Sequence, residues 1–209
     1  MKREMTLANK ITLFRALLAI IMFFLMVTEN PVAVLVASLI FGFAACTDWV
    51  DGRIARATNT YTPFGAIVDP FVDKILVGAA FFAFTDIKFL DVPVWAVFII
   101  ILRELTVSTL RVLAALNYKV LAAERWGKFK TTVQLIAIGI IFVIADVYLC
   151  IPLTKGALNE DISLTSYFLA IFPYPVTVIA AVITCLSAVT YLKNNWALLK
   201  ESWSLPVKK

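Results

Sequence analysis

Long apolar runs alternate with short polar patches along the chain, and each run is about 20 residues long, the length that an α-helix needs to cross a bilayer. The pattern predicts six membrane-spanning helices. Their expected ranges are 10–28, 32–50, 64–85, 92–115, 130–152 and 166–192. We therefore expect an all-α integral membrane protein whose residues 1–209 form a single domain.

Composition supports the membrane interpretation and argues against a water-soluble protein. Hydrophobic residues make up 62% of the 209 positions, and the mean hydropathy is +0.92, whereas soluble domains are about half apolar. Basic residues precede the first run as they do in a signal peptide, but no small-residue cleavage site follows. The first run is therefore expected to be a true span.

Basic residues mark one side of the predicted membrane protein. Those expected on this side are Lys2, Arg3, Lys10, Arg53, Arg56, Lys119, Arg125, Lys128, Lys193, Lys200, Lys208 and Lys209. The opposite loops offer only Lys88 and Lys155. Because Lys and Arg near span ends favour the cytoplasm, we expect both termini on the cytoplasmic side of a cell membrane, in a multi-pass protein typical of bacteria.

The net charge and the histidine count exclude several kinds of function. The formal charge of +5 comes with no nucleic-acid motif, so anionic membrane phospholipids are the expected partners and nucleic acid is not. The chain has no histidine, which excludes a Ser-His-Asp triad and the usual zinc sites. Carboxylates and cations are left to carry any chemistry.

Four aspartates flank the predicted turn between the second and third spans. Asp48 and Asp51 are three residues apart, and Asp69 and Asp73 are four apart, so each pair lies on one face of its own helix. The two pairs are also balanced about residue 60. An antiparallel hairpin would therefore bring all four carboxylates to a similar depth.

Four carboxylates gathered near hydrocarbon repel one another and need a counter-cation or a proton. Mg²⁺ or Mn²⁺ is the natural partner, because these hard cations take oxygen ligands and keep positions for substrate phosphate. Two such ions could bridge a pyrophosphate and stabilise phosphoryl transfer. The plainer alternative is that the acids solvate a loop or pair with Arg53 and Arg56.

The same segment carries the pattern D-x2-D-G-x2-A-R-x8-G-x3-D-x3-D, and it resembles the CDP-alcohol phosphotransferase family at every fixed position. These positions are Asp48, Asp51, Gly52, Ala55, Arg56, Gly65, Asp69 and Asp73. The resemblance implies that the four aspartates ligate the metals and that Asp73 is also the general base for the acceptor hydroxyl. It further implies a homodimer formed through membrane helices.

The resemblance also implies a role for the small residues of the pattern. Gly52, Ala55 and Gly65 would let the cytidine and pyrophosphate of the donor approach the backbone. Arg56 would lie near the diphosphate or lock the hairpin.

A second polar group interrupts the fourth span and the start of the fifth. Its cations are Arg103, Arg111, Lys128 and Lys130. One interpretation is an anion pocket for an acceptor that carries phosphate. The other is a structural network in which Arg103 pairs with Glu104, because an arginine within a span needs a partner or a wet cavity.

The segments 9–15, 103–111 and 127–131 resemble the phosphatidylglycerophosphate synthases of that family, so that the likeness covers most of residues 8–135. This implies CDP-diacylglycerol as donor and glycerol 3-phosphate as acceptor. Val72, in place of an expected alanine, and Ser108-Thr109, in place of Thr-Gly, depart from the pattern. The last two spans show only generic membrane character.

Two residues of the first span are further site candidates. Arg15 either contacts a substrate phosphate or extends its charged end to the membrane surface. Thr12 lies three residues earlier and, with Asn9, could instead cap the helix.

Two alternative functions stay open from the sequence. The first is an enzyme of the same family with another acceptor, making cardiolipin, phosphatidylserine or an inositol phosphate lipid. The second is a cation-coupled transporter, because carboxylates within membrane helices commonly mark ion paths. The chain shows no repeated halves or paired broken helices of the transporter type.

Overall fold

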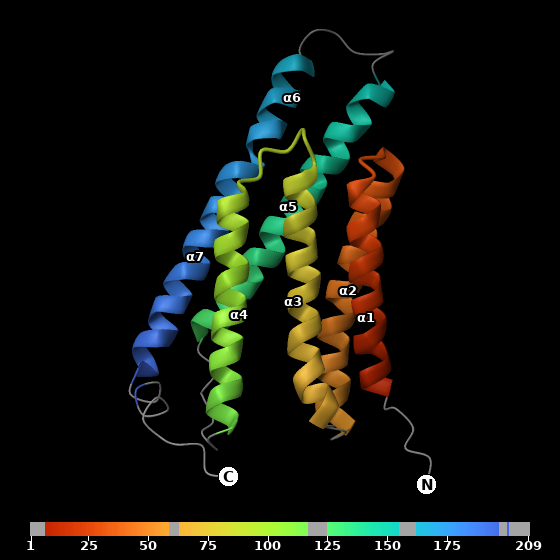
Figure 1. Cartoon of the computed structure of the whole chain (residues 1–209). Helices are drawn as coiled ribbons and strands as arrows, with labels where there is room; N and C mark the ends of the chain where they lie inside the picture. The colour runs from red at the N-terminus through yellow and green to blue at the C-terminus, as the bar shows by residue number, and fades with distance from the viewer. Residues whose placement is uncertain (1–6, 59–62, 117–124, 155–161, 197–199, 201–209) are drawn as a thin grey trace. The chain divides into compact units, whose positions relative to one another are not determined.

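The computed structural model describes residues 7–58, 63–116, 125–154, 162–196 and 200 (Figure 1). Side chains at 7–8, 48–58, 63–67, 69–70, 111–116, 125–126, 128, 150–154 and 162–166 lie outside that description. The helices are α1 Leu7–Val27, α2 Pro31–Thr58, α3 Pro63–Asp86, α4 Val94–Leu116, α5 Arg125–Thr154, α6 Ile162–Ile171 and α7 Pro173–Asn194. Because all regular structure in the described residues is helical, the all-α prediction is confirmed.

The turn between α1 and α2 shows how local sequence sets a helix boundary. Glu29 has a positive φ of 50°, which reverses the chain after α1. The side-chain oxygen of Asn30 then accepts hydrogen bonds from the backbone N–H groups of Val32 at 2.9 Å and Ala33 at 3.4 Å. Pro31 occupies the first helical position, where its missing N–H costs nothing. Asn30 is therefore the N-cap of α2.

Prolines also start α3 and divide the last predicted span. Pro63 begins α3, one residue before the expected start of the third span, and proline suits the first helical position because its missing N–H is not needed there. The range 166–192, expected to be one span, contains the end of α6 and most of α7, and the stretch Tyr167–Asn194 is as a whole long and apolar enough to cross a membrane. Pro173 has no N–H to continue the helical hydrogen bonds, so α6 ends at Ile171 and α7 begins at Pro173.

Three stretches of the described residues are long and apolar enough to cross a membrane, namely Asn9–Val27, Phe129–Leu149 and Tyr167–Asn194. A fourth, Pro31–Thr47, is apolar but shorter. These stretches support a membrane protein. In Asn9–Val27 and Phe129–Leu149 the whole stretch lies within one helix, the form in which a chain can cross a bilayer.

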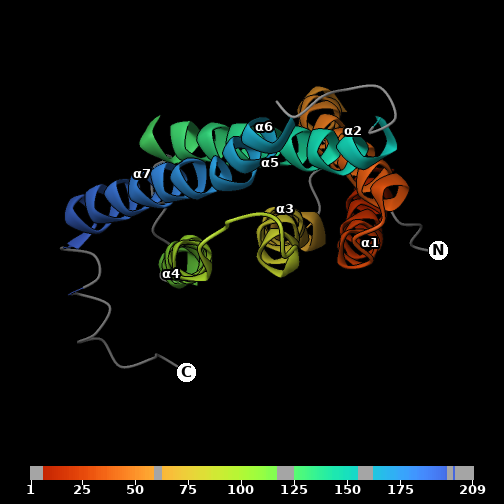
Figure 2. The same cartoon turned by 90° about the horizontal axis from the view of Figure 1, so that it is seen from above.

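The chain forms two compact units. Unit 1 comprises Met1–Val92 and Ile138–Tyr174, and unit 2 comprises Pro93–Ala137 and Pro175–Lys209. In unit 1, α1 packs against both α2 and α3. Figure 2 shows α1 and α3 nearly end-on, so their axes share a direction, whereas α2 is inclined to them.

An aromatic cluster forms the core of unit 1. The ring of Phe142 lies 5.4 Å from that of Phe41 and 4.9 Å from that of Phe84, measured between centroids. All three side chains are buried. The cluster therefore joins α5 to α2 and α3 through close packing, which is the main source of helix association within lipid.

Replacing Phe142 with alanine should open a cavity between these helices. Large-to-small changes of a buried phenylalanine cost about 3 kcal/mol in packed cores, so Phe142→Ala should lower the unfolding temperature in detergent clearly. The control is Phe43→Ala on α2, where the side chain is 55% exposed. Equal unfolding temperatures for the two variants would show that the cluster does not hold unit 1 together.

Candidate active site

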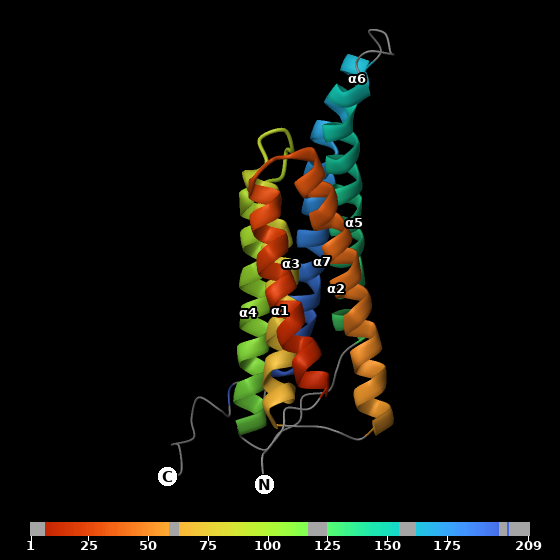
Figure 3. The ribbon, with the colours of Figure 1, turned by 90° about the vertical axis from the view of Figure 1, so that its right-hand side faces the viewer.

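The two pairs of aspartates lie on consecutive helices of unit 1. Asp48 and Asp51 are in the C-terminal part of α2, and Asp69 and Asp73 are in the N-terminal part of α3. The end of α2 and the start of α3 lie at the same end of the unit (Figure 1), although Figure 3 shows α2 slanting away from α3 toward that end. The side chains of Asp48, Asp51 and Asp69 lie outside the described residues, so the convergence of the four carboxylates stays a prediction.

Asp73 is the described member of the four, and it binds Arg15 of α1. The Nη1 of Arg15 donates to Oδ1 of Asp73 at 2.5 Å. The Arg15 side chain is 2% exposed and that of Asp73 is 45% exposed. An arginine extended to the membrane surface would keep its charged end in water, so that alternative is wrong for Arg15. The ion pair instead holds α1 against α3.

Two further polar residues precede Arg15 on α1. Asn9 and Thr12 are both buried, and with Arg15 they are spaced three residues apart, which places them along neighbouring turns of the helix. Since α1 already includes Leu7, neither Asn9 nor Thr12 occupies an N-cap position, and the capping interpretation is wrong. A substrate contact by Thr12 stays a prediction.

The chemistry of these acids fits a hard divalent cation. Asp73 offers carboxylate oxygens on a half-exposed side chain, and oxygen is the ligand atom that Mg²⁺ and Mn²⁺ prefer. Among the residues whose side chains are described, His, Cys, Asp and Glu form no group of three or more. That finding does not bear on Asp48, Asp51 and Asp69, whose side chains lie outside the described residues. Val72, beside Asp73, is 2% exposed and packs in the core of unit 1.

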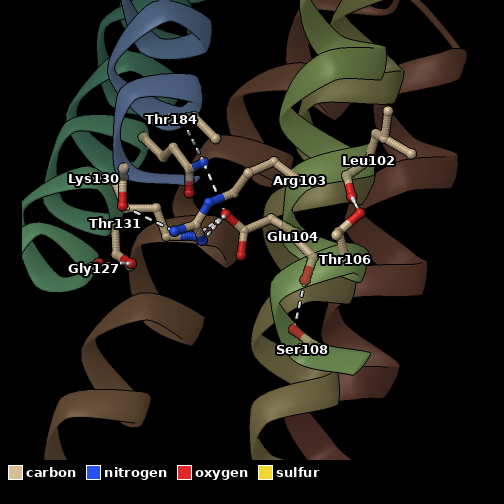
Figure 4. A network of polar contacts seen from close by, with 11 residues as sticks. Leu102, Arg103, Glu104, Thr106, Ser108, Gly127, Lys130, Thr131 and Thr184 are labelled. Atoms are coloured by element: carbon tan, nitrogen blue, oxygen red, sulfur yellow. Dashed lines mark hydrogen bonds and ion pairs between the residues drawn. The ribbon is translucent and has the colours of Figure 1, made fainter. Parts of the chain in front are cut away.

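A second polar cluster occupies unit 2 and is centred on Glu104 of α4 (Figure 4). The Oε1 atom of Glu104 accepts from Nζ of Lys130 on α5 in a short ion pair. The same oxygen lies 3.5 Å from Nη1 of Arg103 and 3.2 Å from Nε2 of Gln134. One carboxylate oxygen thus gathers three donors from two helices.

The cluster also reaches α7. Nη2 of Arg103 donates to Oγ of Ser187 at 2.9 Å, and Nε2 of Gln134 donates to Oγ1 of Thr184 at 3.0 Å. Figure 4 shows Thr184 of α7 at the edge of the group that contains Arg103, Glu104 and Lys130. The structure therefore contains the network that the sequence offered as one interpretation, in which Arg103 pairs with Glu104.

Burial gives this cluster an electrostatic character. The side chains of Arg103 and Lys130 are each 6% exposed, and that of Glu104 is 14% exposed. Glu104 thus supplies negative charge to two nearly buried cations. An arginine and a lysine that lie close together in shielded surroundings are also groups that can bind the oxygens of an anion. The network and the anion pocket are thus compatible.

The structure brings together two of the four predicted acceptor-binding cations. Arg103 and Lys130 share Glu104, whereas the side chains of Arg111 and Lys128 lie outside the described residues. Among the described side chains, the predicted acceptor site therefore comprises Arg103 and Lys130.

Sequence reasoning missed three members of the cluster, which are Gln134, Thr184 and Ser187. Gln134 lies four residues after Lys130, on the same face of α5, and is a lone amide within an apolar stretch. Thr184 and Ser187 are three residues apart in α7 and are fully buried. These buried polar residues contradict the expectation that the last span has only generic membrane character. The three-residue spacing of Thr184 and Ser187, which places them on one face of the helix, could have indicated them.

Comparison with known proteins gives one family match. The family described as CDP-alcohol phosphatidyltransferase matches residues 5–158, most of the chain. Among curated relatives, the chain is 35% identical over 208 residues to the CDP-diacylglycerol–glycerol-3-phosphate 3-phosphatidyltransferase of Bacillus subtilis (strain 168), a match that covers 94% of this chain and 98% of the relative.

Two shorter matches agree with this result. The protein of the same name from Escherichia coli (strain K12) is 39% identical over 144 residues, which are 65% of this chain and 75% of the relative. A protein of Mycobacterium tuberculosis (strain ATCC 25618 / H37Rv), named as a "Probable phosphatidylglycerophosphate synthase", is 40% identical over 143 residues, or 66% of each chain.

The central place of Glu104 can be tested by Glu104→Gln, which removes the charge and keeps the shape. Two buried cations would then lose their counter-charge, which should destabilise the protein by about 3 kcal/mol. Thermal unfolding in detergent measures the effect. The control is Asp86→Asn, which removes an exposed acid at the end of α3. A loss no larger than that of the control would contradict the network.

A double-mutant cycle tests the pair of Arg15 and Asp73. Unfolding of Arg15→Met, Asp73→Asn and the double variant is measured with a chelator present, so that metal does not contribute. Because Asp73 is 45% exposed, the coupling should be modest, about 1 kcal/mol. Pairing Arg15→Met with Asp86→Asn supplies a cycle between the same two helices, and equal coupling in both cycles would contradict a specific ion pair.

Proposed function

This chain belongs to the CDP-alcohol phosphatidyltransferase family, and from that premise we propose that it is a transferase of phospholipid biosynthesis. It moves the phosphatidyl group from CDP-diacylglycerol to glycerol 3-phosphate and releases CMP. The observation that carries the choice of acceptor is the full-length likeness to the Bacillus subtilis protein, whose name states this acceptor. The buried cationic cluster of unit 2 suits an acceptor that carries a phosphate.

In the proposed site, Asp48, Asp51, Asp69 and Asp73 hold two divalent ions, Mg²⁺ or Mn²⁺. When bound, such ions neutralise diphosphate charge and favour departure of the nucleotide. Gly52, Ala55 and Gly65 give the donor room against the backbone, and Arg56 meets its diphosphate. These four assignments follow the family pattern in the sequence.

Asp73 is the proposed general base. Its carboxylate takes the proton of the primary hydroxyl of glycerol 3-phosphate while that oxygen attacks the lipid-bearing phosphorus in line. The bond from this phosphorus to the oxygen of CMP breaks, and CMP leaves with the electron pair. Half-exposure of the Asp73 side chain supports the assignment. Arg15 donates a hydrogen bond to Oδ1 of Asp73 and so helps to set the position of the carboxylate. A bound metal ion would compete with Arg15 for that oxygen.

The acceptor phosphate would bind among Arg103, Arg111, Lys128 and Lys130. Arginine recognises phosphate through paired hydrogen bonds, and lysine does so as a compact charge. Holding the acceptor by its phosphate would leave the far hydroxyl to point at the donor, and such positioning supplies much of the rate in phosphoryl transfer. Thr12 remains a minor candidate for a phosphate contact.

We also propose six membrane crossings with the active site facing the cytoplasm, and a homodimer formed through membrane helices. Within unit 1, the start of α1, the end of α2 and the start of α3 lie at the same end of the unit (Figure 1). Lys10, Arg53 and Arg56 belong to these ends. The clustering supports the orientation, because basic residues near span ends favour the cytoplasm.

The deciding assay supplies purified protein with CDP-diacylglycerol, glycerol 3-phosphate and either Mg²⁺ or Mn²⁺, and measures CMP and the lipid product. We expect phosphatidylglycerophosphate and equal amounts of CMP. Activity should vanish with a chelator and return with the metal. Asp69→Asn and Asp73→Asn should each lose at least a hundredfold in turnover, the usual scale for charge stabilisation and base catalysis, roughly 10²–10⁴-fold.

The outcomes separate the alternatives. CMP formed only with serine, an inositol phosphate or phosphatidylglycerol would keep the family and replace the acceptor. Absence of CMP with every alcohol would favour the cation-coupled transporter. Near-normal turnover by a folded Asp73→Asn protein would refute the assignment of the base.

A further inference from the structure

Gln134 is a buried amide for which the proposed chemistry has no role. Its side chain is 2% exposed, and it lies in the apolar stretch Phe129–Leu149 of α5. An amide in such surroundings is unfavourable unless it is hydrogen-bonded. Nε2 of Gln134 has two acceptors, Oε1 of Glu104 at 3.2 Å and Oγ1 of Thr184 at 3.0 Å.

The orientation of this amide follows from its partners. An ionised Glu104 can only accept hydrogen bonds, so the nitrogen of Gln134 must face it. The two hydrogens of that nitrogen reach acceptors on two different helices, α4 and α7. Gln134 therefore fixes the Glu104 carboxylate to a fully buried anchor, since Thr184 is 0% exposed.

The Glu104 carboxylate in turn holds two cations together. Arg103 and Lys130 carry like charges on neighbouring helices and would repel each other at low dielectric. Oε1 of Glu104 lies between them as the shared partner of both. A shift of this oxygen would change the spacing of the guanidinium and the ammonium, and with it their fit to a single tetrahedral anion.

We propose that Gln134, anchored by Thr184, is a positioning residue that presets Arg103 and Lys130 to receive the phosphate monoester of the acceptor. The inference rests on the proposed function for the identity of the acceptor. The ligand class, a phosphate monoester, is that of the proposed acceptor, and it suits an arginine and a lysine that share one carboxylate oxygen. Gln134 and Thr184 act through Glu104 and do not themselves touch substrate.

Thr184 offers the sharper test, because two near-isosteric variants separate its hydroxyl from its methyl group. Thr184→Val keeps the shape and loses the acceptor of Gln134, whereas Thr184→Ser keeps the hydroxyl and loses packing. The control is Thr190→Val on the same helix, where the hydroxyl donates to the backbone oxygen of Leu186 at 2.9 Å. Gln134→Leu removes the amide itself.

Each variant is compared with the unmutated protein for KM of glycerol 3-phosphate, KM of CDP-diacylglycerol and kcat. Calorimetric binding of inorganic phosphate is measured as well. Loss of one buried hydrogen bond weakens binding by about three- to tenfold. We expect that rise in KM for glycerol 3-phosphate and in Kd for phosphate with Thr184→Val and Gln134→Leu. Thr184→Ser and Thr190→Val should stay near the unmutated values, and KM for CDP-diacylglycerol should not move.

A purely structural role would give another pattern. Thr184→Ser would then be as harmful as Thr184→Val, or both KM values and kcat would change together, and either result would overturn the inference. Equal phosphate binding by Thr184→Val and Thr190→Val would also overturn it. If the unmutated protein used another alcohol but Thr184→Val still weakened phosphate binding, the proposed acceptor would be wrong and the positioning role would stand.

Discussion

The shared Glu104 oxygen is the interaction on which the polar part of unit 2 depends. Arg103 and Lys130 are nearly excluded from solvent, and two such charges could not remain ionised on adjacent helices without an anion between them. Because the donors come from α4 and α5 and the hydroxyl anchors from α7, the same contact that neutralises charge also joins three helices. The stability of this part of unit 2 therefore depends on one carboxylate, which under the proposed function also positions the cations that bind the acceptor phosphate.

Unit 1 also neutralises a buried arginine with a carboxylate, but there the carboxylate is more exposed. Arg15 is fully buried and bound to Asp73, whose side chain remains half exposed. A half-exposed carboxylate pairs more weakly with a cation than a buried one does, so Asp73 stays able to exchange partners. A permanent structural ion pair needs no such access, whereas a metal ligand and a base both need it.

The two units also differ in what packs their helices. In unit 1, Phe41, Phe84 and Phe142 make the inter-helix contacts through aromatic rings. In unit 2, side-chain hydrogen bonds of Gln134, Thr184 and Ser187 also join helices. Within lipid, apolar burial gives little drive to helix association, so ring packing and hydrogen bonds must specify which faces meet.

The sequence by itself determined that the chain is helical and about where most helices lie, because both depend on local chemistry. Some ends differ, since α2 runs to Thr58 and α5 begins at Arg125, beyond the expected ranges 32–50 and 130–152. Runs of about 20 apolar residues demand helices in lipid, and Pro63 starts α3 where its turn predicts. The carboxylate pattern around residue 60 also pointed to the family that the comparisons show. Only tertiary structure decided which side chains meet across helices. The pairing of Arg15 with Asp73 spans 58 residues and that of Gln134 with Thr184 spans 50, and no local rule sets the rotation of one helix against another. For Pro173, the sequence alone indicates a disturbed helix, because proline can either kink a membrane helix or end it. The structure decides that α6 ends before it and α7 begins with it.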